Sequence, residues 1–182
     1  MKKTVWTFGL IAGGILSAMM LLTMPFMDRI GWDRAEVIGY TTMVLAFLLV
    51  FFGIRSYRDN VAGGTIGFGR ALAVGALIVV VASLCYVVTS ELLYFWIAPD
   101  VAANVQAHMM EQVRASAASP AEAQQKIAEM QRFAELYENP FINAAITFIE
   151  PLPVGLVLSL VSAGILSRER RGAHPGLAPS AG

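Results

Sequence analysis

Two carboxylates, Glu91 and Glu150, lie in parts of the sequence that are otherwise strongly apolar. Pro151 follows Glu150 directly, and Pro153 comes two residues later. A proline has no backbone N–H and leaves a carbonyl one turn earlier without its donor, and Pro151 also disfavours helical dihedrals at Glu150. We therefore expect the helix around Glu150 to be kinked or broken. Freed carbonyls beside a carboxylate suit a bound cation, and two carboxylates in close contact suit a shared proton.

The same two carboxylates also have a purely structural interpretation. Counted along their apolar runs, both lie near one boundary of a membrane, within about one helical turn of equal depth. A charged side chain costs about 2.5–3.5 kcal/mol or more at the bilayer centre, and this cost falls toward the interface. We favour this interpretation. A polar site within the membrane, formed by Glu91, Glu150, Pro151 and Pro153, is the alternative.

Other residues that support chemistry lack the necessary spacing. His108 and His174 have no partners at metal-ligand spacing, and a single cysteine, Cys85, excludes an internal disulfide and a cysteine metal cluster. The glycine-rich stretch 63–72 has neither G-x-G-x-x-G spacing nor a following G-K-[ST]. We expect no cofactor, no metal site and no catalytic residue, so a membrane enzyme is the least supported function.

The composition indicates a membrane protein. Of 182 residues, 57% are hydrophobic and 14% are charged, whereas soluble domains have about 25% charged residues. The formal net charge is zero, which gives no reason to expect nucleic acid binding. Residues 5–27 and 37–54 include no charged side chain, and residues 71–97 and 141–166 include one glutamate each. Because a helix of about 20 residues crosses a bilayer core of about 30 Å, we predict four transmembrane helices over these ranges.

The expected fold is therefore all-α, a polytopic membrane protein with four transmembrane helices in one domain, residues 1–171. We predict an extramembrane helical hairpin over about 100–138, between the third and fourth transmembrane helices, and a disordered cytoplasmic tail over 172–182. A cleaved signal peptide at the start is the rival interpretation of the first run. That run is longer than a typical signal core, and no A-x-A-like site closes it.

Basic residues favour one orientation, because lysine and arginine near membrane ends are retained on the cytoplasmic side. They gather before the first run, around the second connection and after the fourth run, at Lys2, Lys3, Arg55, Arg58, Arg70, Arg168, Arg170 and Arg171. We expect a multi-pass protein of the bacterial inner membrane with both termini in the cytoplasm. Residues 98–140 are then periplasmic or extracellular.

The segment 98–140 is polar, alanine-rich and free of glycine, which favours helices over a loose linker. Within it, Ser119, Pro120 and Glu122 have the spacing of a capping box with proline at the first helical position. We therefore predict that a helix begins here.

That helix carries an apolar stripe at three- and four-residue steps, which includes Ile127, Met130 and Tyr137. The stripe either packs against the preceding amphipathic helix or the bilayer surface, or forms a docking face. The docking partner would be a second copy, a membrane protein or a periplasmic protein.

Small residues recur every four positions in the first and last runs, at Gly9, Gly13, Ser17, Gly155, Ser159 and Ala163. Such stripes let helix backbones approach closely in lipid. We expect them to form the closest seam of the bundle or, alternatively, a homodimer interface.

Three stretches, "GIRSYRDNVAGGTIGFGRALAVG", "LLYFWIAPD" and "ENPFINAA", resemble a family of small bacterial membrane proteins catalogued as a domain of unknown function, DUF4199. The resemblance extends over nearly the whole chain and implies a four-helix topology, but it implies no activity. The residues that carry it are Tyr57, Arg58, Asp59, Gly67, Phe68, Gly69, Pro99 and Asp100.

The expected function is that of an uncharacterised integral membrane protein with a non-catalytic structural or accessory role. Its outer hairpin would be the interaction surface. The alternative is a small transporter or ion-coupled carrier that uses Glu91 and Glu150.

Overall fold

The computed structural model describes residues 1–26, 30–97, 99–117 and 119–168, and within its helices it does not describe the side chains of residues 25, 32, 33, 36, 99–106, 109, 133, 137 and 168. The predicted tail over 172–182 lies outside the described residues. The described part of the chain is all-α, without a strand. In order, its elements are α1 (Lys2–Thr23), η1 (Met24–Phe26), α3 (Trp32–Asn60), α4 (Phe68–Leu92), η2 (Leu93–Ile97), α5 (Pro99–Ser116), α6 (Pro120–Tyr137), α7 (Pro140–Ile149) and α8 (Leu152–Arg168).

Four helical segments are long and apolar enough to cross a membrane, as predicted: Lys2–Thr23, Val37–Asn60, Phe68–Ile97 and Pro140–Ser167. Helix α3 extends beyond the apolar run at both ends, over Trp32–Asn60. An uncharged run marks the part of a helix that suits lipid, whereas helical hydrogen bonding continues through polar residues on either side.

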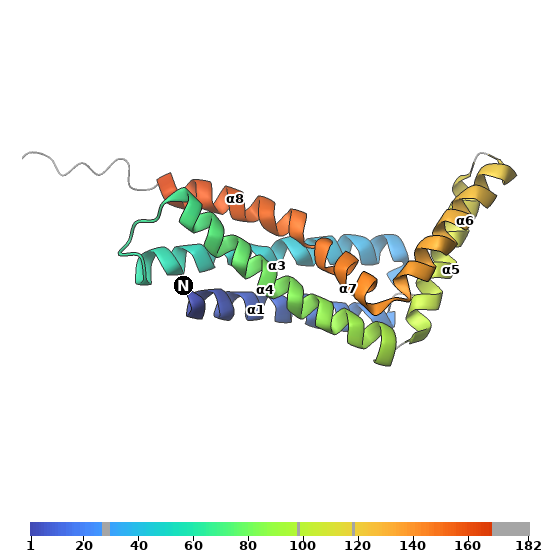
Figure 1. The fold of residues 1–182 in the computed structure, drawn as a ribbon, viewed down its shortest axis with the longest axis horizontal. Helices are drawn as coiled ribbons and strands as arrows, with labels where there is room; N and C mark the ends of the chain where they lie inside the picture. Colours follow the sequence, from blue (N-terminus) through green and yellow to red (C-terminus); the bar gives the residue numbers. More distant parts are fainter. Residues whose placement is uncertain (27–29, 98, 118, 169–182) are drawn as a thin grey trace, which may run out of the picture.

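The four long segments lie side by side, and α5 and α6 lean away from one end of this bundle (Figure 1). Helix α4 is central, because it contacts α1, α3, α7 and α8. Its buried side chains meet those of α3 in a tightly filled core that includes Phe47, Val50, Ile54, Val74, Ile78 and Val79.

Both small-residue stripes pack against α4 and not against each other. A Cβ atom added at Gly13 would lie 2.6 Å from the Cβ of Cys85, and one added at Gly155 would lie 2.5 Å from Cγ1 of Val79. Since such distances are shorter than real carbon contacts, glycine is required at both positions. The expected close seam thus lies inside the bundle and consists of two seams that share α4.

The last segment is divided where its prolines predict. Helix α7 ends at Ile149 and α8 begins at Leu152, with Glu150 and Pro151 in the turn between them. Pro151 is buried and Pro153 is exposed. Pro153 is the second residue of α8. The N–H groups of the first turn of a helix have no acceptor within the helix, so the missing N–H of proline costs no helical hydrogen bond there.

Helices α5 and α6 contact each other and α5 continues from η2, so the pair begins where α4 ends. Pro120 is the first residue of α6, and Ser119 Oγ accepts a hydrogen bond of 3.2 Å from the Glu122 N–H. This contact confirms the predicted start of α6, because the serine side chain satisfies one of the free N–H groups of the first turn.

Candidate functional site

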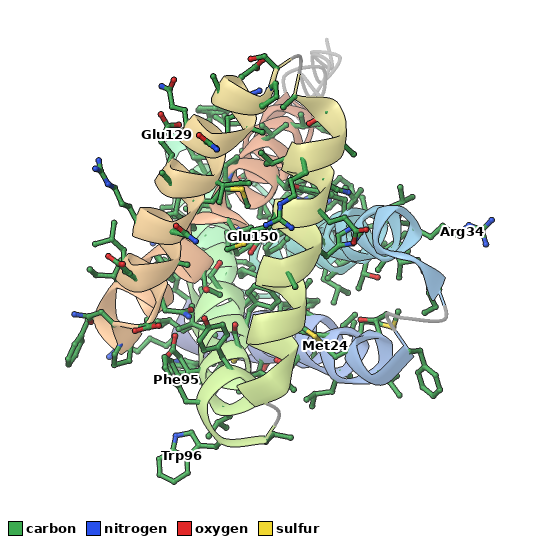
Figure 2. All side chains as sticks on the ribbon, turned by 90° about the vertical axis from the view of Figure 1, so that its right-hand side faces the viewer. Met24, Arg34, Phe95, Trp96, Glu129 and Glu150 are labelled. Carbon is green, nitrogen blue, oxygen red and sulfur yellow. The ribbon has the colours of Figure 1, made fainter. Side chains whose placement is uncertain are left out.

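Glu91 is the penultimate residue of α4, just before the wider π-helical turn η2. Together with Leu92, Phe95, Trp96 and Pro140 it lines a hollow of about 440 Å³, called here the Glu91 hollow. The hollow thus lies between the end of α4 and the start of α7. Figure 2 looks at the bundle from this end, with Trp96 pointing away from the helices.

The Glu91 carboxylate has no protein partner among the described residues. Its Oε1 atom is closed off from solvent and accepts no hydrogen bond, and the side chain forms no ion pair. A buried charge without a partner is costly, because the protein does not replace the water contacts that are lost. Among the predicted site residues whose side chains the structure describes, Glu91 is therefore the one with a buried polar atom that has no partner.

Glu150 has a different environment. It is exposed in the turn between α7 and α8, and its N–H donates to the carbonyl of Ile146 at 3.2 Å. No hydrogen bond joins it to Glu91. The whole of α7, ten residues, separates Glu150 from Pro140 of the Glu91 hollow, which corresponds to about 15 Å along a helix.

The expected equal depth of the two carboxylates therefore needs correction. Pro140, and not Glu150, is level with Glu91, because α7 starts beside the end of α4 and packs along it. Counting residues along each apolar run separately does not show how far one helix is shifted along the other. The carboxylates do not form a pair that shares a proton.

Two buried polar residues of α7 were not identified from the sequence. Asn143 is 1% exposed, and Thr147 donates a hydrogen bond of 3.2 Å to its Oδ1. They lie four residues apart on the buried side of a helix that packs on α4. Polar side chains at helical spacing in an apolar run would have indicated them, because in lipid such groups face protein.

A polar contact also fastens α1 to α4. Thr89 Oγ1 donates to Ser17 Oγ at 2.8 Å, so the third position of the predicted stripe on α1 forms a hydrogen bond and not only a close packing contact. On α4, the buried hydroxyl of Ser83 has no hydrogen-bond partner among the described residues.

Six of the eight residues that carry the family resemblance, from Tyr57 to Gly69, lie at or near the turn between α3 and α4. Tyr57 is buried, and the guanidinium carbon of Arg70 lies 5.9 Å from the centre of its ring. Arg58 Nε lies 2.8 Å from Asp59 Oδ1. The guanidinium of Arg70 over the ring of Tyr57 connects the start of α4 to the end of α3.

The glycines of the turn differ in importance. Gly63 and Gly64 have φ angles of 70° and 84°, which favour glycine, and the Gly64 N–H donates to the Arg58 carbonyl at 2.8 Å. By contrast, Gly67 and Gly69 have open space where a Cβ would be. Phe68, between them, is exposed.

The remaining predicted residues lie on α5 and α6. Ile127 and Met130 are half-buried, on a helix that contacts α5. The side chains of Tyr137, Pro99 and Asp100 lie outside those described, and α5 begins at Pro99. Within the described residues, no group of three or more His, Cys, Asp and Glu side chains could hold a metal ion.

Comparisons with known proteins identify a family but no named relative. No curated protein matches the chain, and no solved structure matches it. One family model matches residues 7–168, which include the first long helical segment from Thr7 onward, the other three segments and the turn motif of α3 and α4. The chain therefore belongs to the family described as protein of unknown function (DUF4199).

Proposed function

We propose that the protein is a multi-pass protein of the bacterial inner membrane with a non-catalytic, accessory role, and that the α5–α6 hairpin is its interaction surface. The observation that carries the membrane placement is the outer surface of the bundle. Large apolar side chains are exposed along all four segments, among them Leu10, Leu48, Leu84 and Leu160. Such a surface is stable in lipid and would be unfavourable in water.

The arrangement of the helix ends supports the proposed orientation. The N-terminus, the α3–α4 turn and the end of α8 lie at one end of the bundle, opposite α5 and α6 (Figure 1). Lys2, Lys3, Arg55, Arg58 and Arg70 belong to that end. Because basic residues are retained in the cytoplasm, the hairpin would be on the other side.

Cysteine labelling tests this orientation. Cys85 is the single cysteine, so Cys85→Ser gives a cysteine-free background in which Thr65 or Ala128, both exposed, is changed to cysteine. With an impermeant maleimide on intact cells, we expect label at position 128 and none at position 65. Permeabilised cells should label both. Label at 65 alone, or protein in the soluble fraction, contradicts the proposal.

The accessory role is supported by the position of α5 and α6, which lean away from the bundle and leave a helix surface outside it (Figure 1). We expect Ile127→Glu or Met130→Glu to abolish a complex seen by native electrophoresis of solubilised membranes. Gln131→Glu, at an exposed neighbouring position, is the matched control. A complex that survives the first two changes excludes this stripe as the interaction surface.

A small ion-coupled carrier is the second candidate, and the unpaired Oε1 of Glu91 is the observation that favours it. The core gives this candidate less support, because the fully buried side chains of Phe47, Ile54 and Ile78 fill the space between α3 and α4. Ion flux into proteoliposomes tests this candidate. Flux that is unchanged in Glu91→Gln and Glu150→Gln would exclude a carrier that uses them.

A further inference from the structure

We propose that the Glu91 hollow binds the ammonium headgroup of a phospholipid. The inference rests on the proposed membrane placement and adds a ligand to it. Three observations carry it: the unpartnered carboxylate of Glu91, the aromatic lining of the hollow, and the exposed apolar surface around it.

The carboxylate sets the charge of the ligand. Glu91 is half-buried, its Oε1 has no hydrogen-bond donor, and no described basic residue pairs with it. A cationic group with N–H donors that enters the hollow would supply the counter-charge that the protein does not provide.

The rest of the lining distinguishes an ammonium group from a metal ion. Leu92, Phe95, Trp96 and Pro140 offer no second oxygen side chain, whereas Ca²⁺ takes about six to eight oxygen ligands and Mg²⁺ about six. Aromatic rings, however, attract ammonium groups through their negative faces. Phe95 and Trp96 therefore suit the headgroup nitrogen and the methylene groups next to it.

The surroundings indicate that the ammonium group belongs to a lipid. Trp96 is 82% exposed and Phe141, next to Pro140, is 85% exposed, more than any other described large hydrophobic residue. Leu92 and Ile97 are exposed beside them. Tryptophan is typical of the headgroup level of a bilayer, and a patch of this kind gives acyl chains a surface next to the carboxylate.

The size of the hollow agrees with a headgroup. Ligand pockets have volumes of about 300–1,000 Å³ and enclose a drug-sized molecule. The Glu91 hollow, about 440 Å³, has room for a headgroup while the acyl chains stay outside, along α4.

Lipid binding to the purified full-length protein in detergent tests the proposal. Native mass spectrometry compares phosphatidylethanolamine, which carries an ammonium group, with phosphatidylglycerol, which does not. We expect the wild type to retain phosphatidylethanolamine preferentially and Glu91→Gln to lose that preference, with binding weakened about tenfold or more, as for a lost hydrogen bond to a charged group. Glu150→Gln, which changes the exposed carboxylate, should keep the preference.

If Glu91→Gln disturbs folding, a second variant tests the same site independently. Trp96→Leu removes an exposed ring without opening the core, and we expect it to weaken phosphatidylethanolamine binding while the thermal unfolding temperature stays unchanged. Free ethanolamine should bind far more weakly than the lipid, because it lacks acyl chains.

Several results would overturn the proposal. They are equal retention of the two lipids, a preference that survives in Glu91→Gln, or binding of free ethanolamine as tight as that of the lipid. If Glu91 were protonated and bound no ammonium group, the lipid preference would survive in Glu91→Gln, since glutamine resembles the protonated acid. None of these results affects cysteine labelling, so a failed lipid site and a failed membrane placement are distinguishable.

Discussion

Gly13 shows how a single hydrogen atom in place of a side chain allows α1 and α4 to touch. A methyl group there would meet the Cβ of Cys85 at 2.6 Å and the carbonyl oxygen of Ala82 at 3.1 Å. We expect Gly13→Ala to push the helices apart and to lower the free energy of unfolding by about 1–3 kcal/mol, as overpacking does. Unfolding of the detergent-solubilised protein, followed by circular dichroism, measures this change.

The neighbouring Gly14 is the matched control, because a Cβ there would have no other atom within 4 Å. Gly14→Ala should be neutral or stabilising, since alanine favours a helix by about 1 kcal/mol over glycine. Equal destabilisation by the two changes would show that α1 does not pack on α4 through Gly13.

At the level of single residues, the sequence identifies chemically unusual side chains better than it identifies the residues that they contact. Glu91 and Glu150 stand out because charged groups are rare in apolar runs, but their separation depends on how α7 starts beside α4. Asn143 and Thr147 carry no charge, so they attract less attention, although Asn143 is among the largest fully buried side chains. Burial of a polar group depends on which helix covers it, and local sequence does not contain that information.

At the level of elements, the start of α6 depends on one side-chain contact, from the Glu122 N–H to Ser119 Oγ. Ser119→Ala removes this cap, which costs about 1 kcal/mol. Hydrogen exchange in the first turn of α6 should therefore become about fivefold faster, while exchange in α1 and α4 stays unchanged. Mass spectrometry of deuterated peptides measures this difference.

Ser116→Ala is the control for the cap, because Ser116 lies at the end of α5 and its hydroxyl only approaches the Val113 carbonyl, at 3.5 Å. It should leave exchange in α6 unchanged. If Ser119→Ala accelerates exchange throughout the chain, the cap contributes to global stability and not to the local start of a helix.

The elements themselves are predictable where a local rule governs them. The apolar runs, the Ser119 cap and the break at Pro151 each follow from a few adjacent residues, and the structure contains all of them. The small-residue stripes predict a close approach but not its partner. Both stripes pack against α4, but the sequence of α4 has no glycines at four-residue spacing that would identify it as the central helix. Of its two glycines, only Gly75 lies in close contact with other helices, at Ser159 and Ile54.

For the whole molecule, the outward surface decides between a bundle in lipid and a bundle in water. Leu48 and Leu84 lie near the middle of their segments and are 44% and 51% exposed. If the bundle were in water, a lysine at either position would be harmless or would improve solubility. In lipid, a charge at the centre of a helix costs about 2.5–3.5 kcal/mol. The same substitution therefore has opposite effects in the two environments.

We expect Leu48→Lys and Leu84→Lys to reduce the amount of protein that resists alkaline extraction from membranes, and the double variant to reduce it further. Thr65→Lys, in the exposed turn before α4, is the control and should behave as the wild type. Immunoblots of membrane and soluble fractions measure the distribution. A double variant that is as abundant and as firmly bound as the wild type would contradict lipid contact at these two faces, because both long side chains would then have to reach water from the middle of the bundle.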